Sequence, residues 1–348
     1  MPMPMPGPSE DKEQFVDRCM GDETMNEDVS DPAQRRAVCE TQWDERGEHA
    51  MKYGHIVPAV FGSPWAILPE TYVTICEIVR LRASGGRLTE ADIAQRLAAA
   101  APRTTARSGP QSIGVLPLYG VLAHRMNMMT AMSGGTSLEL AGRALGELVA
   151  SPQISAIVLD IDSPGGEVNG VTEMAAQVRR ARAIKPVVAV ANSMAASAAY
   201  WIAASASEVV VTPSGQGGSI GVVAAHEDVS AAQERDGVKT TLITAGRFKA
   251  EGSPFAPLGD EARADVQARV DEMYGLFVAD VAKGRDVPLA DVRAGFGEGR
   301  LVTAARAVKL GMADRIATLD ETLSRLAGKR GQGRDDMAAR AALLGIRG

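Results

Sequence analysis

The stretch PVVAVANSMAASAAYWIA, residues 186–203, joins a run of small and β-branched apolar residues to a second run of small and aromatic ones. An apolar run bounded by turn residues predicts a buried strand, and the next segment predicts a helix that begins near Ser197. A serine there either caps the helix or holds its oxygen near the positive end of the helix dipole. In the second case the next N–H group is free to bind an anion. Both interpretations stay open on this pattern alone.

The same strand signal recurs on both sides of this stretch, from residue 112 onward. The predicted strands are SIGVLPLYG (112–120), AIVLDID (156–162), PVVAVA (186–191), EVVVTP (208–213) and SIGVVAA (219–225). The predicted helices between them include SLELAGRALGELVA (137–150) and VTEMAAQVRRARAI (171–184). Buried strands that alternate with helices predict parallel βαβ units, and therefore an α/β fold.

The rest of the chain divides by composition. Residues 1–46 are rich in Asp, Glu, Met and Pro, which predicts an acidic, mobile leader. A short helix around DPAQRRAVCETQW (31–43) and full disorder are both compatible with that composition. Residues 47–110 predict a small helical region, with helices in PETYVTICEIVRLRASGG (69–86) and LTEADIAQRLAAAA (88–101) and a linker after them. We expect the main domain at 111–326 and a polar tail at 327–348.

The net charge, the length of the apolar stretches and the cysteine content indicate which partners and which cellular compartment to expect. The chain has 348 residues and a formal charge of −6, which favours neither a nucleic acid nor an acidic membrane surface as partner. The apolar stretch IVPAVFGSPWAILP is too short for a bilayer span, which needs about 20 residues. The widely spaced Cys19, Cys39 and Cys76 fit neither a disulfide framework nor a zinc site, so we expect a reducing, intracellular setting.

A glycine motif follows the strand predicted at 156–162, in AIVLDIDSPGGEVNG (156–170). Glycines there let backbone N–H groups approach a substrate without obstruction by side chains. Such groups, aimed at a developing oxyanion, contribute ~3 kcal/mol each to catalysis. Taken alone, the motif favours a plain turn between a strand and a helix.

Two residues are candidates for a base that activates Ser197. His226, in VVAAHEDVS (222–230), stands two residues before Asp228. Lys249, in ITAGRFKAEGSPF (243–255), has apolar neighbours such as Phe248. A free lysine amine is protonated at neutral pH, because its pKa is about 10.4, and burial lowers such a pKa by ~3 units or more. These residues alone leave the choice of base open.

Together these blocks resemble the signal peptide peptidase A family of serine peptidases, and more closely its phage branch of lambda-type head-maturation (capsid assembly) proteases. The resemblance covers most of residues 112–320. It rests on IVLDIDSPGGEV, KPVVAVANSMAASAAYWIA, GGSIGVVAAHEDVS, GVKTTLITAGRFKAEGSPFAPL and LVTAARAVKLGMADRI, in that order. AVFGSPWAILPE (59–70) is also similar to the region that precedes the protease domain in phage members.

The resemblance implies a role for each matching residue. Ser197 matches the nucleophile and Lys249 the general base of a Ser/Lys dyad. The amides of Gly166 and Ala198 match the oxyanion hole, and Ser219 matches a serine that hydrogen-bonds the lysine. The implied fold is the Clp-protease/crotonase-like α/β spiral, with 111–326 as the peptidase domain. Family members form rings in which the serine and lysine can come from neighbouring subunits.

The resemblance also implies a function. It is that of a serine endopeptidase that needs no metal or organic cofactor. Its substrates or partners would be capsid, scaffold and portal proteins, and the protease itself, inside assembling proheads in the host cytoplasm. Neither a nucleic acid nor a membrane is expected as a partner.

The sequence also departs from the family pattern in places. Ala-Ala-Tyr follows Ser197 where many bacterial members have Gly-Gly-Tyr, which leaves the local shape of the substrate cleft open. The lack of an anchor favours the phage branch, and we expect a scaffold-like C-terminal region, if there is one, on another chain or beyond this one.

Four alternatives remain from the sequence. The first is a bacterial protease of the same family that works without a membrane anchor. The second is a Clp-like triad of Ser197, His226 and an aspartate such as Asp228. The third is a crotonase-type acyl-CoA enzyme, which does not account for the serine–lysine pair. The last is a non-catalytic assembly scaffold with the same fold, which the filled dyad positions disfavour.

Overall fold

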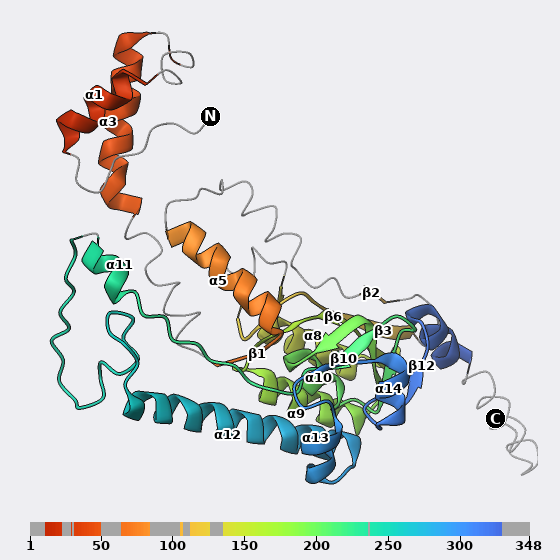
Figure 1. Cartoon of the computed structure of the whole chain (residues 1–348). Helices are drawn as coiled ribbons and strands as arrows, with labels where there is room; N and C mark the ends of the chain where they lie inside the picture. Colours follow the sequence, from red (N-terminus) through yellow and green to blue (C-terminus); the bar gives the residue numbers. More distant parts are fainter. Residues whose placement is uncertain are drawn as a thin grey trace, which may run out of the picture. The chain divides into compact units, whose positions relative to one another are not determined.

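The computed structural model describes residues 11–22, 29, 31–49, 64–83, 105–106, 112–125, 135–235 and 237–328 (Figure 1). The chain forms two compact units, each built from several stretches of sequence. The larger unit consists of Pro64–Tyr72, Leu88–Ala224 and Ala264–Gly348. The smaller unit consists of Met1–Ser63, Val73–Arg87 and Ala225–Arg263. Among the described residues, no helix combines the length and apolar character that crossing a membrane requires.

The main sheet of the larger unit is mostly parallel. Its strands are β2 (Thr105–Ala106), β3 (Ser112–Tyr119), β6 (Ile154–Ser163), β8 (Val187–Ala196), β9 (Glu208–Val211), β10 (Gln216–Gly218), β11 (Leu301–Thr303) and β12 (Arg315–Ile316). Their order is β11-β10-β8-β6-β3-β2, and β9 pairs with β8 and β12. Strands β3, β6, β8, β9 and β10 pair in parallel, whereas β2 and β11 are antiparallel to their neighbours.

Helices connect the parallel strands, as the alternating pattern predicts. In chain order α8 (Leu138–Ala150) precedes β6, α9 (Val171–Arg182) joins β6 to β8, and α10 (Ala198–Ala203) joins β8 to β9 (Figure 1). Alternate residues of β6 enter two different cores, because successive side chains of a strand point to opposite faces. Ile157 and Leu159 pack with the helices, and Val158 packs with Leu323 and Leu326. The predicted α/β class is confirmed.

A smaller sheet stands beside the main one. Its strands are β1 (Trp65–Ile67), β4 (Leu122–Ala123), β5 (Thr136–Ser137) and β7 (Gly165–Glu167), in the order β1-β7-β4-β5. Strand β7 follows β6 after Pro164, so the glycine motif lies where the chain passes from one sheet to the other. Strand β1 is antiparallel to β7, whereas β4 is parallel to it.

Residues 219–225 do not form the predicted strand. Strand β10 ends at Gly218, and Ser219, with φ of 54°, turns the chain away from the ladder. Only Val223 returns to strand pairing, through an isolated antiparallel bridge to Trp65. The apolar pattern predicted burial here, but the turn at Ser219 replaces the regular ladder.

The helices of the smaller unit carry a disulfide that the sequence did not suggest. Helix α1 (Lys12–Met20) and helix α3 (Pro32–His49) are joined by a bond between Cys19 and Cys39, whose Cα atoms are 6.0 Å apart. Phe15 is buried beside it, and its ring centroid lies 5.9 Å from that of Trp43. The expectation that the cysteines form no disulfide is therefore wrong for Cys19 and Cys39, because the helical hairpin brings these two distant residues together.

The other predicted N-terminal elements divide between described and undescribed residues. Helix α5 (Pro69–Ala83) corresponds to the helix predicted at 69–86, whereas the helix predicted at 88–101 lies outside the described residues. Helix α11 (Ser230–Arg235) follows Asp228. The predicted domain boundaries stay a prediction.

Helix α12 (Asp260–Arg285) packs against the helices of the larger unit (Figure 1). Helices α13 (Leu289–Gly295) and α14 (Ala304–Lys309) follow it in the chain. The rings of Trp201 and Phe277 stack with centroids 4.4 Å apart. Trp201 also donates a hydrogen bond to Asp280, which pairs with Arg179 at 2.9 Å. These contacts fix α10, the helix that begins after Ser197.

This packing predicts opposite effects for two glycines of α12. A side-chain carbon on Gly284 would lie 2.1 Å from the carbonyl oxygen of Ala204, whereas one on Gly275 would meet nothing within 4 Å. We expect Gly284→Ala to lower the free energy of unfolding by about 1–3 kcal/mol through overpacking. Gly275→Ala should raise it by up to about 1 kcal/mol, because alanine favours helix. Urea unfolding followed by circular dichroism measures both, and equal stabilities would contradict the packing.

Candidate active site

Ser197 occupies a strained turn between a strand and a helix. Its φ of 53° and ψ of −119° match the first central position of a type II′ turn, which glycine normally takes. Its N–H donates to the carbonyl of Gly218 at 2.7 Å, and its own carbonyl accepts from the N–H of Trp201 at 2.9 Å. Pairing with β10 on one side and helix α10 on the other thus hold the residue in place. Strain of this kind persists where the surroundings impose it, and it is common at functional sites.

The hydroxyl of Ser197 does not cap α10. No side-chain capping bond is made, and Oγ donates instead to the carbonyl of Gly221 at 3.3 Å. The residue is 0% exposed. The capping interpretation is therefore wrong, and the hydroxyl lies among backbone groups.

The glycine motif lies against Ser197. A side-chain carbon on Gly165, whose φ is 104°, would lie 3.0 Å from Cβ of Ser197. One on Gly166 would lie 1.8 Å from the carbonyl oxygen of Leu122 in β4. Both positions therefore exclude larger residues because backbone or Ser197 itself is too close. The structure brings the SPGG turn and Ser197 together, as the sequence predicts.

Ser219 and Ala198 also lie at this place. Gly218, the residue before Ser219, pairs with Ala196, the residue before Ser197, in the parallel β8–β10 ladder. Ser219 is 4% exposed, and its N–H donates to the carbonyl of Arg300 at 2.9 Å. Ala198 is fully buried at the start of α10. Four of the predicted site residues, including Gly166, therefore come from adjoining turns of one unit.

Lys249 lies in the smaller unit, in residues 237–259, which form neither helix nor strand. The backbone N–H of Lys249 donates to the carbonyl of Gly246 at 3.1 Å, and the residue is exposed. Arg247 pairs with Glu261 at 2.8 Å and lies over the ring of Phe248, which is itself 50% exposed. The apolar cover expected for the lysine is therefore not found among the described residues. The dyad stays a prediction.

His226 and Asp228 are each engaged in local structure. Nε2 of His226 lies 3.2 Å from the carbonyl oxygen of Ala256. Asp228 accepts the N–H of Ser230 at 2.9 Å, at the start of α11. Hydrogen bonds from Ser230 lower the pKa of Asp228, with a smaller contribution from the charge of His226. These partners are typical of a turn and a helix start, and they do not favour the triad interpretation.

A polar cluster at the carboxyl end of the main sheet was not predicted. Asp160 is only 4% exposed, and it accepts hydrogen bonds from the hydroxyl of Tyr119 and from Nδ2 of Asn192. Burial, and then the hydrogen bond to Asp160, raise the pKa of Tyr119. Burial also raises the pKa of Asp162, although a hydrogen bond from Ser193 opposes it. The signal in the sequence was the pair of aspartates inside the apolar run LDID.

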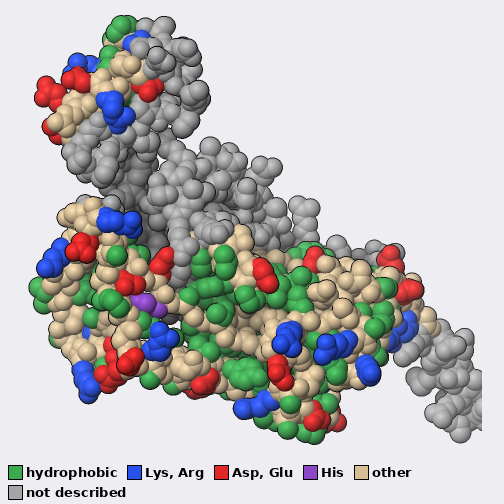
Figure 2. Space-filling view, in the orientation of Figure 1, with side chains coloured by type: hydrophobic (Ala, Val, Ile, Leu, Met, Phe, Trp, Pro, Cys, Tyr) green, Lys and Arg blue, Asp and Glu red, His purple; other side chains and the backbone are tan. Residues whose placement is uncertain are grey.

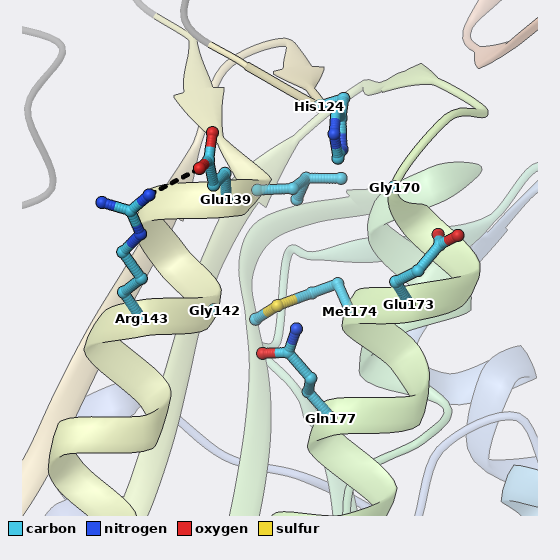
Figure 3. A pocket seen from close by; sticks show the side chains of 9 residues that line it. His124, Glu139, Gly142, Arg143, Gly170, Glu173, Met174 and Gln177 are labelled. Atoms are coloured by element: carbon cyan, nitrogen blue, oxygen red, sulfur yellow. Dashed lines mark hydrogen bonds and ion pairs between the residues drawn. The ribbon is translucent and has the colours of Figure 1, made fainter.

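A cavity of about 300 Å³, which the sequence did not predict, lies between α8 and the first turns of α9 (Figure 3). It is lined by His124, Leu138, Glu139, Gly142, Arg143, Gly170, Glu173, Met174 and Gln177. Figure 3 shows Met174 and Gln177 pointing from α9 toward α8, and Arg143 paired with Glu139 on the other wall. Gly170, which lines the cavity, comes three residues after the end of β7. The cavity is therefore bordered by the segment that follows the SPGG motif.

The strain at Ser197 predicts an unusual order of stability. Ser197→Gly should unfold at higher urea concentration than Ser197→Ala. Relief of about 1–3 kcal/mol of strain exceeds the unfolded-state entropy cost of glycine, about 0.4–1 kcal/mol. Ser205 is the matched control, because it is equally buried but does not have a positive φ. There Ser205→Ala should be more stable than Ser205→Gly, and the same order at both positions would contradict the strain.

Comparison with known proteins adds an independent observation. The model of peptidase family S49 matches residues 179–332. Capsid assembly protease C of Escherichia phage lambda is 34% identical over 229 residues, covering 63% of this chain and 52% of the relative. Head-tail preconnector protein GP5 of Enterobacteria phage P21 is 34% identical over 215 residues, covering 62% and 42%. The Synechocystis sp. protein slr0021 is 30% identical over 197 residues, covering 57% and 70%.

These matches confirm the predicted resemblance, including its phage branch. The chain spans about half the length of the phage relatives it matches. The matched region contains Ser197, Ser219 and Lys249, and the alignment with slr0021 extends over more than two thirds of that relative. The chain belongs to peptidase family S49.

Proposed function

We propose that the chain is a serine endopeptidase in which Ser197 is the nucleophile and Lys249 the general base. The observation that carries this proposal is the turn at Ser197. A buried serine is held in a glycine-like conformation, against the SPGG motif, at the end of a parallel strand. A nucleophile on a strained strand-to-helix turn is a recurring arrangement in hydrolases. Membership of the peptidase family supports the same conclusion.

In the proposed mechanism Lys249, as a neutral amine, removes the proton from Ser197. Oγ forms a bond to the carbonyl carbon of the scissile peptide, and the amides of Gly166 and Ala198 bind the resulting oxyanion. The C–N bond then breaks, and the lysine returns its proton to the leaving amine. A water molecule, deprotonated by the same lysine, then attacks the acyl carbon. The C–Oγ bond breaks, the lysine returns the proton to Oγ of Ser197, and the second product leaves.

The exposed setting of Lys249 makes oligomer formation part of the proposal. A lysine amine is neutral near pH 7 only when it is removed from water. The segment around it presents apolar side chains to solvent in the single chain, among them Leu242, Phe248 and Ile243, which is 96% exposed. Apolar groups displayed in this way mark contact surfaces. We infer that a neighbouring copy covers this segment and that the dyad forms across that contact.

Ser219 fits the role of positioning the lysine. It follows Gly218, which pairs with Ala196, the residue before Ser197, and it is almost fully buried. Within the described residues its hydroxyl has no hydrogen-bond partner, so it is available to accept a hydrogen bond from an incoming amine. Such a hydrogen bond would hold the amine of the lysine toward Ser197 rather than toward solvent.

We propose phage head assembly as the setting. The relatives from phages lambda and P21 are named as a capsid assembly protease and a head-tail preconnector protein. Capsid, scaffold and portal proteins, together with the protease itself, are the proposed substrates or partners, inside proheads in the host cytoplasm.

On the described face in Figure 2, acidic and basic side chains are interspersed rather than gathered into one patch. We propose residues 111–326 as the peptidase domain.

Two substitutions, at Lys249 and His226, distinguish the dyad from the triad alternative, and a third tests Ser197, the nucleophile of both. We expect Ser197→Ala and Lys249→Ala each to lower the cleavage rate of a co-expressed capsid protein by ~10³-fold or more, as removal of a catalytic group does. His226→Ala should retain activity. Lys239→Ala is the matched control, because Lys239 is an exposed lysine of the same segment. Cleavage that survives loss of Lys249 but not of His226 would contradict the dyad.

A further inference from the structure

The short strand β1 comes from the region before the peptidase domain, yet it is the neighbour of two segments that border Ser197. On one side it pairs antiparallel with β7, the strand of the SPGG motif. On the other side Trp65 exchanges two backbone hydrogen bonds of 2.8 Å with Val223, which follows the Gly221 carbonyl that holds Ser197 Oγ. The chain has therefore inserted one of its own strands between the two edges of its candidate active site.

The register places Ala66 opposite Gly166, the proposed oxyanion donor. In an antiparallel ladder every second residue pair exchanges hydrogen bonds. Leu68 donates to Pro164 at 3.0 Å and Val168 donates to Pro64 at 3.5 Å, so these two pairs are hydrogen-bonded ones. The pair of Ala66 and Gly166 lies midway between these two pairs, so it is a hydrogen-bonded pair as well. The N–H of Gly166 is thus directed at the carbonyl of Ala66.

The carbonyl of Ala66 also lies beside Ser197. A side-chain carbon on Gly165 would be 2.3 Å from the Ala66 oxygen and 3.0 Å from Cβ of Ser197, so both atoms border the same point. Ser197 and Ala66 are both 0% exposed. Solvent therefore reaches neither residue in the single chain.

This arrangement is that of a peptide bound by strand addition. In such complexes main-chain hydrogen bonds to an open strand edge supply affinity, and pockets for alternate side chains supply specificity. Trp65 provides the anchor, since it is 2% exposed and its ring centroid lies 6.0 Å from that of Tyr72 in α5. Ala66 provides a small residue, and its carbonyl oxygen borders the same point as Cβ of Ser197.

We propose that Trp65–Ile67 is a substrate-like plug of the peptide-binding groove, with Ala66 in the place of the residue whose carbonyl is attacked. The protein is latent while β1 is bound, and β1 must leave before an extended peptide with a small residue at that position can enter. The proposal rests on the proposed function, because it takes the groove beside Ser197 as the substrate site.

Peptide binding tests the plug without any catalysis. The probe is a fluorescein-labelled octapeptide with the sequence of residues 63–70, SPWAILPE, and the protein is the full chain carrying Ser197→Ala. We expect Trp65→Ala in this background to bind the probe at least tenfold more tightly, measured by fluorescence anisotropy. Ala66→Pro should act in the same way, because proline lacks the N–H that pairs with β7. Val73→Ala, at an exposed position of α5, is the matched control and should change nothing.

Equal affinity of the parent and both folded variants for the probe would overturn the plug, as would an absence of binding to all of them. A scrambled octapeptide controls for non-specific binding, and circular dichroism shows which variants are folded. If one variant fails to fold, the other still decides.

A second measurement separates this proposal from the proposed function. In the chain with Ser197 intact, the rate of reaction with an alkyl fluorophosphonate should rise at least tenfold on Trp65→Ala. Equal rates with and without the substitution would leave Ser197 as the nucleophile but overturn the plug. Tight peptide binding by the variant without any reaction at Ser197 would instead support the plug and contradict the proposed nucleophile.

Discussion

The backbone of Ser197 is held from both sides, by a parallel strand pair before it and by a helix after it, and this forces a conformation that glycine usually takes. The hydrogen bond from its N–H to Gly218 ties it to β10, and its carbonyl begins the hydrogen bonding of α10. The stacked Trp201 and Phe277 rings then fix α10 against α12. Because the strain is imposed by this packing, the hydroxyl is directed at backbone groups rather than at a helix cap. The glycines of the SPGG motif lie against that turn.

Glycine supplies the second constraint, since the backbone of β7 has to approach both Ser197 and β4. At Gly166 even one carbon would lie 1.8 Å from a carbonyl oxygen, and at Gly165 it would contact Ser197 and β1 together. The same closeness that would let amides reach an oxyanion also lets the chain's own strand fill the groove. The site is thus built to accept extended backbone, and in the single chain β1 takes that position.

Apolar runs in the sequence predicted the buried parallel strands of the main sheet. The apolar runs gave correct positions for β3, β6, β8 and β9, because buried parallel strands carry a continuous apolar signature. The family resemblance, rather than a local pattern, implied that the SPGG motif and Ser197 lie together, and they do. The pairing of Cys19 with Cys39, the turn at Ser219 and the insertion of β1 depend on contacts between distant segments. No periodicity in the sequence encodes such contacts, so they were missed.

The account depends most on an amine reaching Ser197 after the chain has assembled. The direct measurement is an experimental structure of the assembled, full-length protein, in which the distance from Ser197 Oγ to Lys249 Nζ is determined within each subunit and across each contact. The account predicts one such pair within hydrogen-bond reach, about 2.6–3.2 Å or bridged by a single water. A structure in which no Lys249 amine, from any copy, comes within that reach of Ser197 would contradict it.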